Sequence, residues 1–241
     1  MTASRRAGPR RRQVGSGAPA QDTTICLFAK PPVAGIAKTR LAPALGAAGA
    51  AELAFALLQD TWAAVAGCAW ARGVVATPAP ERWDVDLAGR PEVWAQGEGD
   101  LGARMERVAR RALTESRRVL LVGADSPGIP AGALTDARRR LGAADAVLCP
   151  TPDGGFWALG LRRCPEGALA EVEWSAATTL RATEARLQRL ELRVDRGVAW
   201  LDVDVPADLA LAAAAIARGD ALAPATRAAL ERGRARGSPS P

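Results

Sequence analysis

The sequence predicts an α/β fold in which helices cover both faces of a mostly parallel sheet. Short apolar runs, typical of buried strands, alternate along the chain with longer stretches whose apolar residues recur at helical spacing. The length of 241 residues, of which 49% are hydrophobic, suits one α/β domain with a sizeable core. Such an alternation gives parallel strands joined by crossover helices, and no repeat or internal linker interrupts it.

The first part of the chain supplies three predicted strands, over residues 24–29, 72–76 and 92–95, each an apolar run bounded by turn residues. Residues 47–65 lie between the first two strands. They are apolar but broken by two acidic residues and a glutamine, which predicts an amphipathic helix. We therefore expect no membrane-spanning segment.

The middle of the chain repeats the alternation. Residues 101–115 carry apolar side chains on one face and predict a helix. Residues 118–123 contain four consecutive apolar residues and form the clearest strand of the sequence. A helix over 131–141 and a strand over 146–149 follow.

The last part is predicted to complete the sheet. Residues 156–161 predict a strand close behind the preceding one, and a helix over 177–190 leads to strands over 192–194 and 200–203. A final helix starts after Pro206, because proline is favoured in the first turn of a helix.

The two ends of the chain hold most of its positive charge. The formal net charge is +6; the residues before Asp22 contribute +5 and those from Arg227 onward +3, which leaves −2 for the centre. We divide the chain into a basic leader (1–22), a body (23–220) and a basic C-terminal tail (221–241). The leader lacks hydrophobic periodicity and is predicted to be disordered, with no apolar segment of the kind that export signals have.

The composition excludes several kinds of chemistry. The sequence contains no histidine and no tyrosine, so carboxylates, lysine, arginine and hydroxyls must carry any acid–base step. Its four cysteines are scattered, without a CxxC pair, and form no zinc motif. Unpaired cysteines fit a reduced, cytoplasmic setting.

Polar and glycine-rich clusters follow the predicted strands, whereas the turns at the opposite edge are plain. In parallel sheets ligands bind at the carboxyl ends of the strands, so this asymmetry is the main argument for an active site. The clusters are residues 30–40, 96–104, 125–127, 153–155 and 202–208.

Only two of the 32 basic residues are lysines, and both lie in the first cluster. Lys30 and Lys38, with Thr39 and Arg40, are predicted to surround nucleotide phosphates, because compact ammonium groups and backbone N–H groups suit phosphate oxygens. Lys38 is also predicted to be catalytic, by stabilising charge on a departing phosphate. The alternative is an ordinary basic loop.

Two acidic strand ends predict a metal site. Asp125 follows the clearest strand and Asp204 follows the last one, so both carboxylates should face one crevice. Oxygen ligands of this kind suit Mg²⁺ or Mn²⁺, and Asp125 would thereby be catalytic. Asp202 would support them. In the alternative interpretation, Asp125 only stabilises the turn after its strand.

The remaining clusters would contact the substrate. In the turn Asp153-Gly154-Gly155 the glycines allow a ligand to approach closely, and Asp153 is the candidate catalytic base; a plain hairpin turn is the alternative. Asp100 and Arg104 are predicted to bind the nucleotide, although Asp100 could simply cap its helix.

These clusters occur in the order of a known family, which they resemble. The matching segments are Phe28-Ala29-Lys30, Lys38-Thr39-Arg40-Leu41-Ala42-Pro43, Asp60-Thr61, Gln96 through Met105, Gly123 through Pro127, Asp153 through Phe156, and Asp202 through Pro206. The chain is similar to a glycosyltransferase-A-like transferase family of the type associated with arsenosugar biosynthesis and radical-SAM/selenium genes. It departs from the family pattern at Phe156, Val205 and Ala207.

The resemblance implies a nucleotide-diphospho-sugar transferase (GT-A, Rossmann-like) fold, with Asp125 and Asp204 at the metal and Lys30, Lys38 and Arg40 around the phosphates. The region from Lys38 to Leu41 is also similar to 2-phospholactate guanylyltransferases, which share the fold. Fold similarity leaves the reaction type open.

Three functions follow from the sequence. The first is transfer of a sugar from a nucleotide-diphospho-sugar to a small-molecule acceptor. The second is nucleotidyl transfer, which joins a nucleoside triphosphate to a phosphorylated small molecule, releases pyrophosphate and needs no base because phosphate is already ionised. The third is a non-catalytic module whose basic ends bind nucleic acid. We expect the first, with a nucleotide and a small acceptor as partners and without membrane or nucleic acid.

Overall fold

The computed structural model describes residues 21–237 and has a seven-stranded sheet at its centre. The strands are β1 (Thr23–Phe28), β2 (Ala71–Thr77), β3 (Glu92–Ala95), β4 (Arg118–Gly123), β5 (Ala146–Pro150), β6 (Phe156–Leu161) and β7 (Val194–Arg196). Their spatial order is β3-β2-β1-β4-β6-β5-β7. β6 runs antiparallel to both of its neighbours, and the other pairs are parallel. The predicted α/β fold with a mostly parallel sheet is confirmed.

Six α-helices accompany the sheet in the described part of the chain. They are α1 (Ala42–Ala66), α2 (Leu101–Glu115), α3 (Ala133–Arg140), α4 (Thr179–Arg189), α5 (Pro206–Arg218) and α6 (Pro224–Gly237). The helix α1 begins five residues earlier than the predicted residue 47. It does so because Gly46, with φ 71° and ψ 163°, adds a kink that joins a further turn to the predicted helix.

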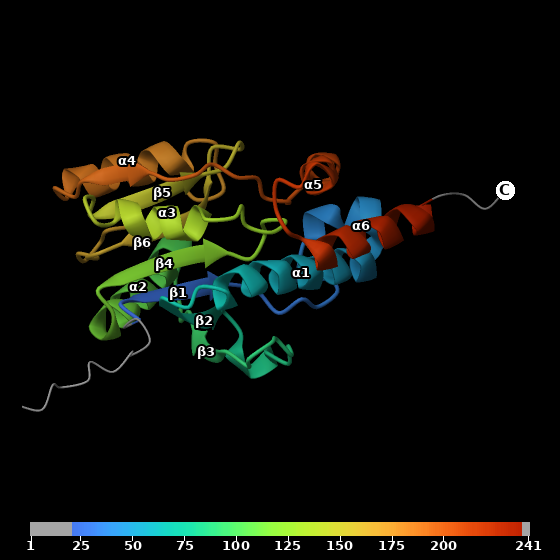
Figure 1. Ribbon diagram of the computed structural model, residues 1–241, viewed down its shortest axis with the longest axis horizontal. Helices are drawn as coiled ribbons and strands as arrows, with labels where there is room; N and C mark the ends of the chain where they lie inside the picture. The colour runs from blue at the N-terminus through green and yellow to red at the C-terminus, as the bar shows by residue number, and fades with distance from the viewer. Residues whose placement is uncertain (1–20, 238–241) are drawn as a thin grey trace, which may run out of the picture.

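Alternating strand residues divide the core into two layers. Ile25 and Leu27 of β1 face α1 and α3, whereas Cys26 between them faces α2 and α4. Figure 1 shows α1 and α3 in front of the sheet and α2 behind it. The six strands other than β6 are parallel, so their carboxyl ends meet at one edge of the sheet. In Figure 1 the arrows of β1 and β4 point toward this edge, on the side of α5 and α6.

The C-terminal stretch is not the tail that the sequence suggested. Residues 224–237 form α6, which lies alongside α1 in Figure 1. A third cluster, separate from the two faces of the sheet, joins Leu53 and Leu57 of α1 to Ala212 of α5 and Ala229 of α6. The sequence did not predict this helix, because its few apolar residues are mostly alanines and give little amphipathic signal among the arginines.

One stretch, Thr39–Ala66, is long and apolar enough by composition to cross a membrane. In the fold, α1 is a core helix: Leu57, Leu58, Trp62 and Val65 are each at most 5% exposed. Its buried residues pack on two sides, against the sheet and against α6.

The predicted strand over residues 200–203 is wrong. This stretch makes only isolated backbone bonds, from Trp200 N to Pro150 O (3.0 Å) and from Val203 N to Asp125 O (3.0 Å), and so does not join the sheet ladder. The strand expected over 192–194 is found two residues later, as β7. Of the predicted leader, residues 1–20 lie outside the described residues.

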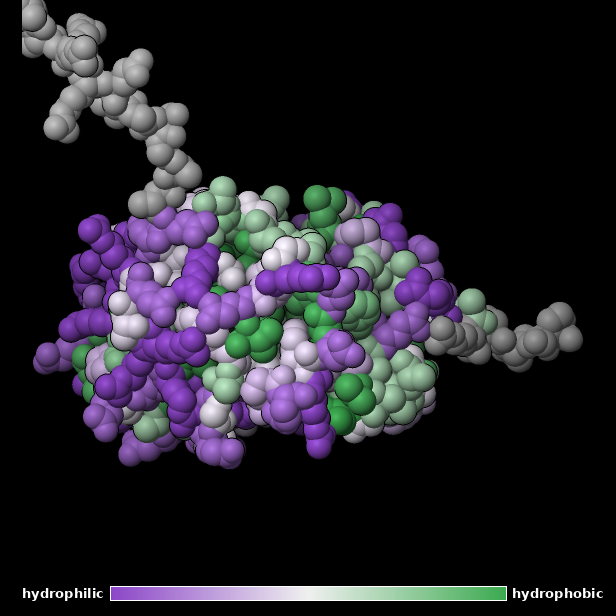
Figure 2. All heavy atoms as spheres, turned by 90° about the horizontal axis from the view of Figure 1, so that it is seen from below, coloured by the Kyte–Doolittle hydropathy of each residue, from purple (hydrophilic) through white to green (hydrophobic). Residues whose placement is uncertain are grey.

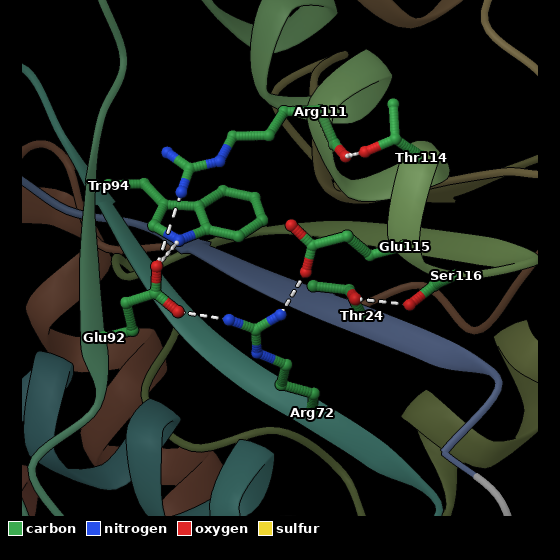
Figure 3. A network of polar contacts seen from close by, with 8 residues as sticks. All are labelled: Thr24, Arg72, Glu92, Trp94, Arg111, Thr114, Glu115 and Ser116. Atoms are coloured by element: carbon green, nitrogen blue, oxygen red, sulfur yellow. Dashed lines mark hydrogen bonds and ion pairs between the residues drawn. The ribbon is translucent and has the colours of Figure 1, made fainter.

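A polar network ties the far edge of the sheet together, away from the strand ends discussed below (Figure 3). Arg72 forms ion pairs with Glu92 and Glu115, and the guanidinium of Arg111 lies 3.8 Å from the centre of the Trp94 ring. Figure 2 shows hydrophilic side chains gathered over this end of the molecule and hydrophobic residues interspersed toward α6. The charged end therefore serves to bind β2, β3 and α2 to one another.

Replacing Asp60 should loosen α6. Its buried carboxylate accepts hydrogen bonds from Ala225 N (3.1 Å) and Thr226 N (2.7 Å), the first N–H groups of α6. Since losing such a cap costs about 1–2 kcal/mol, we expect Asp60→Ala to lower the free energy of unfolding by that amount in urea titrations. Asp84→Ala, at an exposed position, is the control; equal stability of the two variants would contradict the capping role.

Candidate active site

A cleft of about 690 Å³ opens at the carboxyl edge of the sheet. All predicted site residues except Gly154 line it: Lys30, Lys38, Thr39, Arg40, Asp100, Arg104, Asp125, Asp153, Gly155 and Asp204. They come from five separate segments of the chain. The structure thus brings the sequence clusters to one place, while their chemical roles stay predictions.

Lys38 connects the loop after β1 to the segments that carry Asp125 and Asp204, and all three residues line the cleft. Its Nζ lies 2.7 Å from Oδ1 of Asp125 and 2.6 Å from Oδ1 of Asp204, and its side chain is only 7% exposed. The two carboxylates are half-exposed, at 54% and 45%, and so remain open to the cleft. The lysine loop and the two predicted acidic segments do meet, although Asp204 does not end a strand, because residues 200–203 lie outside the sheet.

Backbone and hydroxyl contacts hold the two acidic loops in place. Val203 N donates to Asp125 O at 3.0 Å, which links the segment before Asp204 to the end of β4. Asp208 Oδ2 accepts from the backbone N–H groups of Asp204 and Val205, both at 2.8 Å, and so caps α5. The buried Thr61 of α1 donates to Ser126 O at 3.2 Å.

The lysine is held by its backbone as well as by its charge. Lys38 has left-handed backbone angles, φ 50° and ψ 41°, immediately before the short 3₁₀ helix Thr39–Leu41. Such a conformation is unfavourable for a non-glycine residue and often marks a functional site. It turns the Lys38 side chain away from the exposed loop 33–36 and into the cleft.

The charges around Lys38 perturb two pKa values. Burial alone would lower the pKa of Lys38, but the adjacent carboxylates of Asp125 and Asp204 outweigh it and raise the pKa above its ordinary value. Burial raises the pKa of Asp202 to about 7, and the charges of Asp153 and Asp204 add to this effect. Lys38 is therefore cationic at neutral pH, and Asp202 is partly protonated there.

The turn after β5 places Asp153 in the cleft. Oδ1 of Asp153 accepts from Thr151 Oγ1 (2.5 Å) and from Gly155 N (2.9 Å). Gly154 belongs to this turn; it has φ +90°, and its carbonyl accepts a hydrogen bond from Leu180 N at 2.8 Å. This turn does connect two antiparallel strands, so the hairpin interpretation is confirmed, and Asp153 lines the cleft as well.

Asp100 and Arg104 lie together at the start of α2. Asp100 caps the helix, since its Oδ1 accepts from Ala103 N at 2.8 Å. Arg104 donates to Oε1 of the buried Gln96 (3.2 Å) and to Asp100 O (3.2 Å). Both side chains border the cleft, so capping and a nucleotide contact are compatible for Asp100.

An aromatic wall of the cleft was not evident from the sequence. Phe156 and Trp174 meet edge to face, with ring centres 6.2 Å apart, and both line the cleft. Trp157 also borders the cleft, but it is buried and donates its indole N–H to Val198 O at 2.9 Å. No signal in the sequence marked Trp174, because this residue lies in an irregular segment between β6 and α4 that has no hydrophobic periodicity.

The donors around Lys38 fit a divalent cation only in combination with a substrate. Within residues 21–237, no group of three acidic, cysteine or histidine residues is arranged to hold a metal ion alone. Mg²⁺ is usually held by one or two carboxylates together with water and substrate phosphates. Asp125 and Asp204 match that requirement in number and in chemistry.

The model of the family described as "Uncharacterized protein conserved in bacteria (DUF2064)" matches residues 54–176. None of the curated proteins matches the sequence. Among solved structures, a candidate nucleotide-diphospho-sugar transferase from Desulfovibrio desulfuricans G20 is similar with a TM-score of 0.80 and 28% identity; the match covers 89% of this chain and 96% of that one.

More distant structures share the fold alone. The homologue of Mycobacterium tuberculosis Rv0371c from Mycobacterium sp. strain JC1 matches with a TM-score of 0.56 and 20% identity, over 83% of this chain and 98% of that one. The bifunctional IspDF from Campylobacter jejuni matches with a TM-score of 0.54 and 11% identity, over 78% of this chain and 53% of that one.

Replacing Gly154 should distort the turn that carries Asp153. A Cβ at this position would lie 2.1 Å from the carbonyl oxygen of Ala177. Gly89 has a similar φ of +77°, and a Cβ there would meet no atom within 4 Å, so Gly89→Ala isolates the backbone strain. We expect Gly154→Ala to cost about 1–3 kcal/mol more than Gly89→Ala in urea titrations. An equal loss of unfolding free energy in the two variants would show that the turn rearranges to accommodate the added Cβ.

Removing the charge of Asp202 should change the pH dependence of stability. Because its folded pKa of about 7 exceeds the unfolded value, the carboxyl stabilises the fold at low pH and this contribution is lost as the pH rises through 7. Asp202→Asn should therefore gain stability relative to wild type at pH 8 more than at pH 5, measured by urea unfolding in EDTA. An equal difference at both pH values would contradict the pKa shift.

Proposed function

The chain belongs to the bacterial family DUF2064. We propose that it is a transferase that moves a sugar from a nucleotide-diphospho-sugar to a small-molecule acceptor, assisted by Mg²⁺ or Mn²⁺. The observation that carries the proposal is the meeting of Lys38, Asp125 and Asp204 in the cleft at the carboxyl edge. Two open carboxylates could hold a divalent cation together with substrate phosphates, and a nearby ammonium could stabilise charge on the phosphate oxygens. The similarity to the Desulfovibrio protein supports the sugar nucleotide as donor.

The residues of the cleft would divide the work as follows. Lys30 and Arg40 are exposed and free of ion pairs among the described residues, so their cationic groups are available to the diphosphate. Thr39, Asp100, Arg104 and Gly155 would border the nucleotide, whereas Gly154 does not line the cleft and would act only through the shape of its turn. A cation held by Asp125 and Asp204 would neutralise charge on the phosphate oxygens.

In the transfer, the bond between the sugar's anomeric carbon and the diphosphate oxygen breaks, and a bond from the acceptor oxygen to that carbon forms. The nucleoside diphosphate leaves with the bonding electrons, and Lys38 stabilises its new charge. The acceptor hydroxyl loses a proton, which Asp153 would take as the base. Thr151 and Gly155 N hold Asp153 in position for that step.

Nucleotidyl transfer is the second candidate. The absence of histidine from the sequence favours it, because a phosphate acceptor needs no base. The same cationic loop and carboxylates would then serve a nucleoside triphosphate and release pyrophosphate. For either reaction we also propose that the protein is cytoplasmic and that it acts in association with arsenosugar biosynthesis or with radical-SAM/selenium genes.

A product assay distinguishes the two reactions. The protein, with Mn²⁺ or Mg²⁺ and cell extract, is incubated with nucleotide sugars or with nucleoside triphosphates, and nucleoside diphosphate and pyrophosphate are measured separately. We expect extract-dependent release of nucleoside diphosphate from a nucleotide sugar. Pyrophosphate release from a triphosphate would instead establish nucleotidyl transfer.

Asp125→Asn should abolish metal-dependent nucleotide binding while the protein stays folded, because Asp204 still compensates the charge of the Lys38 ammonium. Asp220→Asn, an exposed acid outside the cleft, is the matched control. Unchanged nucleotide binding in Asp125→Asn would remove Asp125 from the site.

A further inference from the structure

We propose that Lys38 acts as an exchangeable counterion, so that the protein binds a divalent cation and a diphosphate as a pair and binds the cation weakly alone. The inference rests on the proposed function and concerns how its site is filled. Its basis is that the ammonium contacts one carboxylate oxygen of Asp125 and one of Asp204, at 2.7 and 2.6 Å.

The contact geometry sets up a competition for the same oxygens. A cation held by both carboxylates would approach the Oδ1 atoms that Lys38 now contacts, and the two positive charges would repel each other in a site where the lysine is 7% exposed. A divalent cation arriving alone must therefore displace a buried, charged partner.

A diphosphate relieves that conflict. One ammonium, two carboxylates and one divalent cation carry a net charge of +1, which the phosphate oxygens neutralise. The long, flexible stem of lysine allows the ammonium to move from the carboxylates to a phosphate oxygen without a change in the left-handed backbone of Lys38. Each ligand thus creates a better site for the other, which is reciprocal coupling between two binding events.

The neighbouring lysine provides a matched comparison. Lys30 lines the same cleft and belongs to the same loop, but it is exposed and no ion pair joins it to an acid within residues 21–237. The two lysines therefore differ in the respect that matters for the exchange, which is contact with Asp125 and Asp204. Lys38 should therefore influence the affinity for the cation in the absence of nucleotide more than Lys30 does.

Equilibrium dialysis of Mn²⁺ tests the inference, with and without ADP, GDP, UDP or CDP. In wild type we expect at least one diphosphate to tighten Mn²⁺ binding about tenfold or more, in the range of typical coupling between sites. Lys38→Met should bind Mn²⁺ without nucleotide about tenfold more tightly than wild type and lose most of the coupling. Lys30→Met should change the affinity for Mn²⁺ in the absence of nucleotide much less than Lys38→Met does, because no ion pair joins Lys30 to Asp125 or Asp204 within residues 21–237.

The outcomes separate this inference from the proposed function. Wild type that binds Mn²⁺ equally with and without every diphosphate, or Lys38→Met with no gain in Mn²⁺ affinity, would overturn the exchange while leaving a metal-dependent transferase standing. No Mn²⁺ binding by either protein under any condition would overturn the metal site itself. Circular dichroism checks that Lys38→Met is folded. If this variant does not fold, the effect of the diphosphates on the Mn²⁺ affinity of the wild-type protein remains the test of the exchange.

Discussion

The cleft end of the molecule depends on one buried ammonium between two carboxylates. Lys38 comes from the loop after β1, Asp125 from the end of β4 and Asp204 from the segment before α5, so these contacts join parts of the chain that are up to 166 residues apart. A single buried lysine between two acids is stable because each carboxylate compensates part of its desolvation. The same balance leaves one negative charge, which suits the site to a cation that arrives with phosphate.

Contacts from α1 fix the positions of the segments around these three residues. α1 contributes Asp60, which caps α6, and the adjacent Thr61, which holds the turn after Asp125. Gly128 in that turn packs against Leu222, where an added Cβ would lie 2.6 Å from the carbonyl oxygen. The C-terminal helix, outside the span matched by the family model, is thereby fastened to the loop that carries a predicted metal ligand.

Much of this could be predicted from local patterns. The bounds of β3, α2, β4 and β6 follow directly from apolar runs and helical spacing, because these elements are bordered by clear turn residues. The expected strand at 200–203 failed because an apolar, extended segment can satisfy its backbone by isolated bonds to Pro150 and Asp125 without entering a ladder. The segment α6 was missed because its alanine-rich face acquires meaning only against α1.

The sequence by itself determined the fold class, the edge of the sheet that carries the candidate site and most of the residues gathered there, since the parallel strands end at one side of the sheet. Asp204 is the exception, because residues 200–203 form no strand. The tertiary structure alone decided which of these residues touch. Contact between Lys38, Asp125 and Asp204 depends on the left-handed turn at Lys38 and on the bond from Val203 N to Asp125 O, and neither leaves a pattern in the sequence. Likewise, only tertiary packing brings Trp174 against Phe156 in the wall of the cleft, while Trp200 donates its indole N–H to Gly128 O outside it.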